Sequence, residues 1–173
     1  MPTRFRSRSG STPTKPMGTS QRIVEVVLDE RSVVRRNADI EHERAVALRD
    51  LMEGNEFAPL SGHPGPFHLR IGLEEDRLVL DIRSIAAEPI ERVMLPLQPF
   101  RGIIRDYFLI CGNYYAAVRT QNPARIEAID MGRRSLHDEG AELLRERLAE
   151  RVTVDRETAR RLFTLICVLH IRG

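Results

Sequence analysis

The sequence contains no tryptophan, and aromatic residues make up only 5% of its 173 residues. No uninterrupted apolar stretch exceeds five residues, whereas a membrane-spanning helix needs about 20. The first twenty residues are basic and contain no apolar central region, so they do not resemble a secretory signal peptide. These absences argue against a membrane-spanning or secreted protein. We therefore expect a cytoplasmic location and no contact with a membrane.

Cysteine is also scarce, since Cys111 and Cys167 are the only two. Both lie inside apolar runs, where a cysteine usually acts as a small buried hydrophobic residue. The sequence contains no Gly-rich dinucleotide loop, phosphate loop, HExxH, CxxC or GxSxG motif. No two of the five histidines are three or four residues apart, so a metal site would need ligands from distant segments, such as His42 and His137. We expect neither a cofactor nor a metal.

Lysine occurs once, at Lys15, so nearly all of the positive charge is carried by arginine. Residues 1–22 hold five basic residues and no acidic one, which leaves the remainder of the chain slightly acidic although the whole carries +2. The first 21 residues are rich in Ser, Thr, Pro, Gly and Arg and poor in large apolar side chains, a composition typical of disorder. We predict a disordered basic tail over residues 1–21 and a single domain over residues 22–173.

The pattern of apolar residues predicts four strands and four helices. We expect a strand over 23–28, a helix from Asn37 or Asp39 to Gly54, a loop over 58–66, a hairpin over 67–83, an edge strand over 90–97, and helices over 100–118, 122–150 and 155–170. Because the strands precede most of the helices, the predicted fold class is α+β. The expected architecture is a small antiparallel sheet of three to four strands, packed against the three C-terminal helices and one helix from the N-terminal half.

Two of these helices have features that bear on packing. Apolar residues almost encircle the 100–118 helix, which predicts that it lies at the centre of the core. In the 122–150 helix, Gly132 and Gly140 lie on the same stripe as Leu136. Each glycine costs about 1 kcal/mol relative to alanine inside a helix. We therefore expect another helix, either the last one or one from a second subunit, to approach closely at both positions.

The candidate functional residues are Asp130, Arg133, Arg134 and His137 on the same helix. The functional interpretation is an anion pocket in which the two arginines hold a phosphate or carboxylate and His137 acts as acid or base. The simpler interpretation is a solvated face with ion pairs between residues four apart, as for Asp130 and Arg134. The sequence favours the simpler interpretation, in which His137 lies on an exposed polar flank.

Four segments resemble a known family. They are DIEHERAVA at residues 39–47, PFRGIIRDYFLICGNYYAAVRT at 99–120, RIEAIDMGRRSLHDEG at 125–140 and RLFTLICVLHIRG at 161–173. They are similar to the bacterial uncharacterised protein family numbered 0262 in the UPF series, and the likeness runs from about Arg22 to Gly173. The resemblance implies no activity, cofactor or catalytic residue.

Three functional hypotheses remain. The leading one is a non-catalytic cytoplasmic protein that binds a protein partner or self-associates, which requires an exposed apolar patch. The second is a small enzyme acting on a phosphorylated or carboxylated metabolite, which requires a pocket where Arg133 or Arg134, His137 and a residue from another segment converge. The third and weakest is association with RNA or the ribosome through the N-terminal tail.

Overall fold

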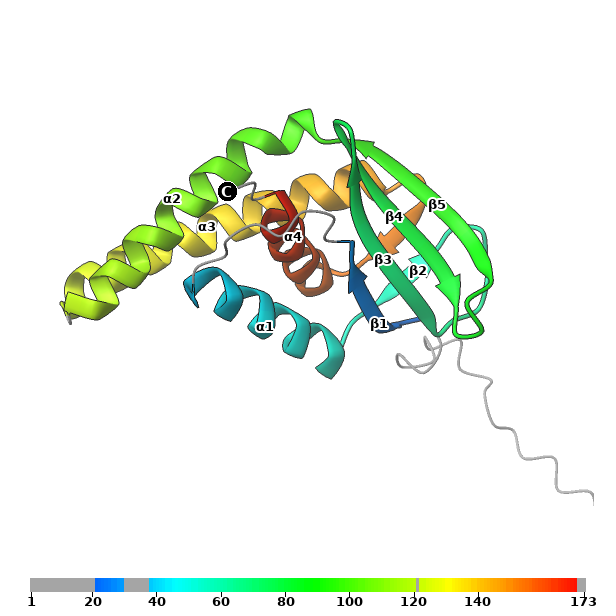
Figure 1. Ribbon diagram of the computed structural model, residues 1–173, viewed down its shortest axis with the longest axis horizontal. Coiled ribbons are helices and arrows are strands. Elements are labelled where there is room, and N and C mark those ends of the chain that lie inside the picture. Colours follow the sequence, from blue (N-terminus) through cyan, green and yellow to red (C-terminus); the bar gives the residue numbers. More distant parts are fainter. Residues whose placement is uncertain (1–20, 30–37, 121, 171–173) are drawn as a thin grey trace, which may run out of the picture.

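The computed structural model describes residues 21–29, 38–120 and 122–170. A four-stranded sheet forms one layer, and the helices lie together on one of its faces (Figure 1). The opposite face carries no helix in the described part of the chain (Figure 1). Four helices and the sheet confirm the predicted α+β class.

The sheet contains β1 (Ile23–Leu28), β3 (Phe67–Glu74), β4 (Arg77–Ser84) and β5 (Pro89–Pro96), in the order β1-β3-β4-β5. The predicted hairpin and the edge position of the last strand are confirmed. The sheet is mixed rather than antiparallel, because β1 pairs with β3 in parallel. A parallel pair requires a long crossover, and here the chain between β1 and β3 contains a whole helix.

A second sheet was not predicted. It consists of β2 (Phe57–Pro59) and β6 (Val152–Val154), which pair antiparallel over three residues each. The predicted loop over residues 58–66 therefore begins inside a strand. Strands this short contain too few residues to show an alternating pattern, so only their pairing identifies them.

The helices are α1 (Ala38–Glu53), α2 (Gln98–Thr120), α3 (Pro123–Leu148) and α4 (Arg156–His170). The central helix is α4, which lies between α1 and the α2–α3 pair and is buried at every residue from Thr158 to Val168 except Arg160 and Arg161 (Figure 1). The prediction that α2 is central was wrong. Its buried stripe is narrow, and Leu109 and Val118 are 64% and 41% exposed, because α2 packs mainly against α3.

The start of α3 and its two glycines follow the expectation from the sequence. Asn122 caps the helix by accepting a hydrogen bond from the Arg125 amide at 3.2 Å, and Pro123 follows at the first helical position. A Cβ at Gly132 would lie 2.6 Å from Ile110 of α2, and one at Gly140 would lie 2.4 Å from Phe163 of α4. Both close approaches come from helices of the same chain.

Two expectations fall partly or wholly outside the described residues. Residues 1–20 of the predicted basic tail, and with them the hypothesis of RNA association, lie outside the described residues. Asn37, one of the two expected caps of the first helix, also lies outside them.

Among the described helices, none is both long and apolar enough to cross a membrane. Cys111 and Cys167 are free and buried, as predicted.

Candidate functional site

A pocket of about 220 Å³ lies where α1, α3 and α4 meet. We call it the α1–α3–α4 pocket. On the α1 side, carboxylates and small apolar groups line it; on the α3 and α4 sides, arginines predominate. Its lining residues are Glu43, Val46, Ala47, Asp50, Arg133, Arg134, His137, Arg160, Arg161 and Thr164. The hypothesis of a small-molecule site requires Arg133 or Arg134, His137 and a residue from another segment to converge, and they do so here.

Glu43, one of the lining residues, is buried and only 8% exposed. It accepts hydrogen bonds from the Tyr107 hydroxyl at 3.1 Å, the Tyr115 hydroxyl at 2.7 Å and Arg133 Nη1 at 2.8 Å. A buried carboxylate is tolerated only when paired and hydrogen-bonded. Burial raises the pKa of both tyrosines, with the negative charge of Glu43 adding to the effect, so both hydroxyls remain donors at neutral pH.

Arg133 is the cation that compensates Glu43. Its Nε and Nη2 donate to Asp130 at 3.2 and 2.9 Å, while Nη1 donates to Glu43. The guanidinium lies 4.1 Å from the centroid of the Tyr114 ring, a cation–π geometry. Although burial opposes the charge, the hydrogen bond to Asp130 and the charge of Glu43 raise the pKa of Arg133. All three guanidinium nitrogens are thus committed to neighbouring carboxylates, and Arg133 holds the site together.

His137 is half-buried rather than exposed, which corrects the prediction of an exposed polar flank. Its ring lies 4.8 Å from the Tyr107 ring, centroid to centroid, and its Nε2 lies 3.3 Å from Thr164 Oγ1 on α4. Burial lowers the pKa of His137 to about 4, and Arg133 and Arg160 lower it further while Glu43 opposes them. The imidazole is therefore neutral at physiological pH.

The other arginines of the pocket share their carboxylate partners. Arg134 is 69% exposed and pairs at 2.8 Å with Asp130, which also serves Arg133. Arg160 and Arg161 both reach Glu157, at 3.0 and 3.6 Å. The Nε of Arg161 is buried and has no hydrogen-bond partner in the described part of the chain. Positive charge is therefore in excess along the α3 and α4 walls.

The structure brings together all four residues proposed from the sequence. Arg133, Arg134 and His137 line the pocket, and Asp130 pairs with both arginines at its edge. The expected ion pairing is confirmed for Asp130 and Arg134.

Sequence reasoning missed the contributions of the other helices, which are Glu43 from α1 and Arg160, Arg161 and Thr164 from α4. Glu43 carries no local signal of burial, because it lies among the acidic residues of the first turns of α1. Its place is shown only by its tertiary hydrogen bonds to Tyr107 and Tyr115 of α2 and to Arg133 of α3.

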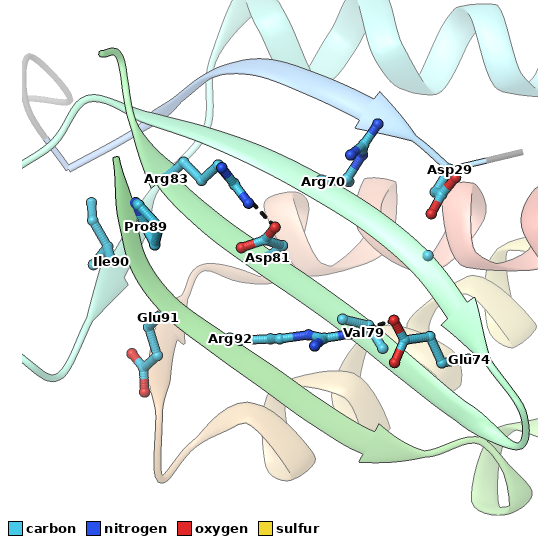
Figure 2. A pocket seen from close by; sticks show the side chains of 11 residues that line it. Asp29, Arg70, Glu74, Val79, Asp81, Arg83, Pro89, Ile90, Glu91 and Arg92 are labelled. Atoms are coloured by element: carbon cyan, nitrogen blue, oxygen red, sulfur yellow. Dashed lines mark hydrogen bonds and ion pairs between the residues drawn. The ribbon is translucent and has the colours of Figure 1, made fainter. Parts of the chain in front are cut away.

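A second, larger depression of about 490 Å³ lies on the uncovered face of the sheet (Figure 2). Arg92 reaches from β5 across β4 to pair with Glu74 on β3, and its side chain lies beside Val79 (Figure 2). Arg83 pairs with Asp81 at 3.1 Å. Opposite charges alternate here and largely neutralise one another, so this surface lacks the excess of one sign found in the α1–α3–α4 pocket.

Metal binding has no geometric support in the described residues, where no group of three or more His, Cys, Asp or Glu side chains is placed to hold an ion. His42 and His137 therefore belong to no such group within the described residues. His42 instead packs its ring edgewise against Tyr115, with 6.3 Å between centroids.

Comparison with known proteins assigns the family. The profile described as "Uncharacterised protein family (UPF0262)" matches residues 20–172. The chain belongs to the UPF0262 family. The UPF0262 protein of Rhodospirillum rubrum is 56% identical over 151 residues, covering 87% of this chain and 93% of the relative. That of Paramagnetospirillum magneticum is 56% identical over 153 residues, covering 88% and 98%.

A third UPF0262 relative, from Azorhizobium caulinodans, is 57% identical over 155 residues, covering 88% of this chain and 95% of the relative. No solved structure gives a significant match. The names of these relatives state no activity, so any functional conclusion for this UPF0262 chain depends on the geometry described above.

Proposed function

We propose that this protein binds a small molecule carrying a phosphate or carboxylate in the α1–α3–α4 pocket. The observation that carries the proposal is the charge imbalance of the lining, which contains four arginines and only two carboxylates, Glu43 and Asp50. Glu43 is itself saturated by Arg133 and two tyrosines. An oxyanion would supply further acceptors to Arg134, Arg160 and Arg161 through charge-assisted hydrogen bonds, whereas the nitrogens of Arg133 are already engaged.

The sharing of carboxylates supports this proposal. Glu157 is the partner of both Arg160 and Arg161, so this pair of guanidinium groups is not neutralised one to one, whereas Arg133 and Arg134 have Glu43 and Asp130 between them. The Nε–H of Arg161 is buried and donates to no acceptor in the described part of the chain. The free-energy cost of removing it from water is therefore not offset by a hydrogen bond there. The pocket volume of about 220 Å³ is below the range usual for drug-sized ligands, about 300–1,000 Å³. The expected ligand is therefore a small metabolite rather than a nucleotide.

The pocket also offers a group for proton transfer. Neutral His137 lines it next to the arginines, and a neutral imidazole accepts a proton from a bound molecule. Catalysis on the bound anion is the extension of this proposal, with His137 as base and the arginines as anion anchors. Anion binding is the property to be tested first, because it precedes any chemistry.

The test is a titration of the full chain with inorganic phosphate, followed by two-dimensional NMR and by calorimetry. We expect amide shifts concentrated at α3 and α4 residues of the pocket, and at least about tenfold weaker binding in Arg160→Ala, given the usual strength of hydrogen bonds to charged groups. The matched control is Arg105→Ala, because Arg105 is 75% exposed on α2 and does not line the pocket. Absence of binding, or shifts centred on the uncovered sheet face, contradicts the proposal.

A protein partner or self-association is the second candidate. It is favoured by Leu109 on α2 and Met131 on α3, which are 64% and 65% exposed. Single exposed apolar residues are common on monomeric proteins, so this support is weaker than that for the pocket. Sedimentation of the wild type and of a Leu109→Ser, Met131→Ser double variant tests it, and a monomer in both cases argues against self-association.

We also propose a cytoplasmic location. The support is the state of the two cysteines, which are both free and buried, as is usual in a reducing compartment. Fractionation of cells producing the tagged protein is the direct test.

A further inference from the structure

This inference rests on the proposed anion site and concerns what the bound molecule must carry besides its negative charge. It begins with the hydroxyl of Thr164. That hydroxyl donates to the Arg160 carbonyl oxygen, one turn earlier in α4, at 3.1 Å. A hydroxyl has a single hydrogen to donate and oxygen lone pairs that accept.

The contact between Thr164 Oγ1 and His137 Nε2, at 3.3 Å, must therefore run in the other direction. Because the Thr164 hydrogen is already engaged, Nε2 is the donor and carries the imidazole proton. A neutral imidazole has only one N–H, so its other nitrogen, Nδ1, holds a bare lone pair. Within the described residues, Nδ1 has no hydrogen-bond partner.

The surroundings of the ring preserve this state. The imidazole packs against the Tyr107 ring and is charged only in acid, since burial lowers its pKa to about 4. The charged groups that face it are Glu43 from α1, Arg133 and Asp138 from α3, and Arg160 from α4. Nδ1 is thus a hydrogen-bond acceptor on the α3 and α4 walls of the pocket, where arginine donors predominate.

We infer that the ligand carries an O–H or N–H donor next to its oxyanion, and that this donor hydrogen-bonds to His137 Nδ1 while the arginines hold the anion. Phosphate that retains a proton fits this requirement, as do carboxylates bearing a neighbouring hydroxyl or ammonium group. An oxyanion with no proton to donate fails it, because it would face the Nδ1 lone pair with a second acceptor and leave both unsatisfied. A polar site rejects an analogue that lacks the matching hydrogen far more strongly than an apolar site does.

Phosphate and sulfate provide the test, because at about pH 8 both are mainly dianions of similar size and only phosphate keeps a proton. Calorimetry on the full chain should give at least about tenfold tighter binding of phosphate than of sulfate. In His137→Phe, which keeps an aromatic ring against Tyr107, the two affinities should become equal. Arg105→Ala is again the matched control and should keep the discrimination.

Nitrogen-15 NMR of labelled histidine gives a second measurement that does not depend on a variant. In the free protein, Nε2 should show the shift of a protonated nitrogen and Nδ1 that of an unprotonated one, and phosphate but not sulfate should move the Nδ1 resonance. A proton on Nδ1 in the free protein overturns the inference. Equal binding of the two anions in the pocket overturns it while leaving the proposed function intact, whereas binding of neither contradicts both.

Discussion

A methyl group added at Gly140 provides a direct test of how α3 packs on the central helix. The new Cβ would lie 2.4 Å from Phe163 Cζ and 2.5 Å from Cε1 and Cε2, whereas carbons in good contact are about 3.5–4.0 Å apart. The ring would have to move by about 1 Å. Phe163 is fully buried and packs against Tyr107, with 6.1 Å between ring centroids, so it has no free direction in which to move.

The magnitude follows from two opposing effects. Overpacking a well-filled core costs about 1–3 kcal/mol, and three ring atoms in collision place this site in the upper half of that range. Replacing glycine by alanine inside a helix returns about 1 kcal/mol. We expect Gly140→Ala to lower the free energy of unfolding by about 1–2 kcal/mol, which corresponds to roughly 2–8 °C in the melting midpoint for a chain of this size.

Gly132→Ala is the matched control in the same helix. Its Cβ would meet only Ile110 Cδ1, at 2.6 Å. Ile110 is half-buried, and the end of its flexible side chain can rotate away. We expect the free energy of unfolding of Gly132→Ala to lie within about 0.5 kcal/mol of the wild-type value or to exceed it, since helix propensity favours alanine. Urea unfolding followed by far-UV circular dichroism measures both variants, and a Gly140→Ala variant as stable as the wild type would refute the packing argument.

Three further predictions concern the buried polar groups. The pKa of His137 is lowered in the folded protein to about 4 from 6.5, so between these pH values the unfolded chain binds more protons than the folded one. The free energy of unfolding should therefore fall as the pH falls from 6.5 to about 4. Urea unfolding at several pH values measures this fall, which should be smaller in His137→Phe. Arg133→Met should lower the free energy of unfolding by about 3 kcal/mol because it leaves the Glu43 carboxylate buried without a cation; a change under about 1 kcal/mol in urea unfolding would contradict the role assigned to Arg133. Burial raises the pKa of Cys111 to about 12 and that of Cys167 well above its usual range, so neither thiol should react with Ellman's reagent until urea is added.

Local sequence patterns predict most of the fold because each long element carries its own signal. The alternating residues of β3 and β4, and the Asn122–Pro123 start of α3, need no knowledge of the rest of the chain. The three-residue strands β2 and β6 and the parallel direction of β1 depend on contacts between segments far apart in sequence. Those contacts are tertiary, and the periodicity of apolar residues within one segment does not predict them.

The candidate site shows the same division. The spacing of Asp130, Arg133, Arg134 and His137 puts them on one side of α3, and the structure agrees. A helical wheel treats the polar side of a helix as facing solvent. Here α3 packs on α2 along one line and on α4 along another, so polar residues at the junction are partly enclosed, and His137 is half-buried beside Thr164. Glu43, which completes the network, comes from a helix roughly 90 residues earlier.

The ion pair between Arg92 and Glu74 has a consequence for association. It crosses the uncovered face of the sheet beside Val79, which is only 6% exposed although none of the described helices lies above it (Figure 2). Without these charges, an apolar side chain on an open sheet face would offer a flat hydrophobic surface on which the sheet of another molecule could pack. Stacking a second sheet there would require stripping water from Arg92, Glu74 and the neighbouring Arg83–Asp81 pair, which is unfavourable. The charged pairs therefore disfavour sheet-to-sheet aggregation on a face that none of the described helices covers.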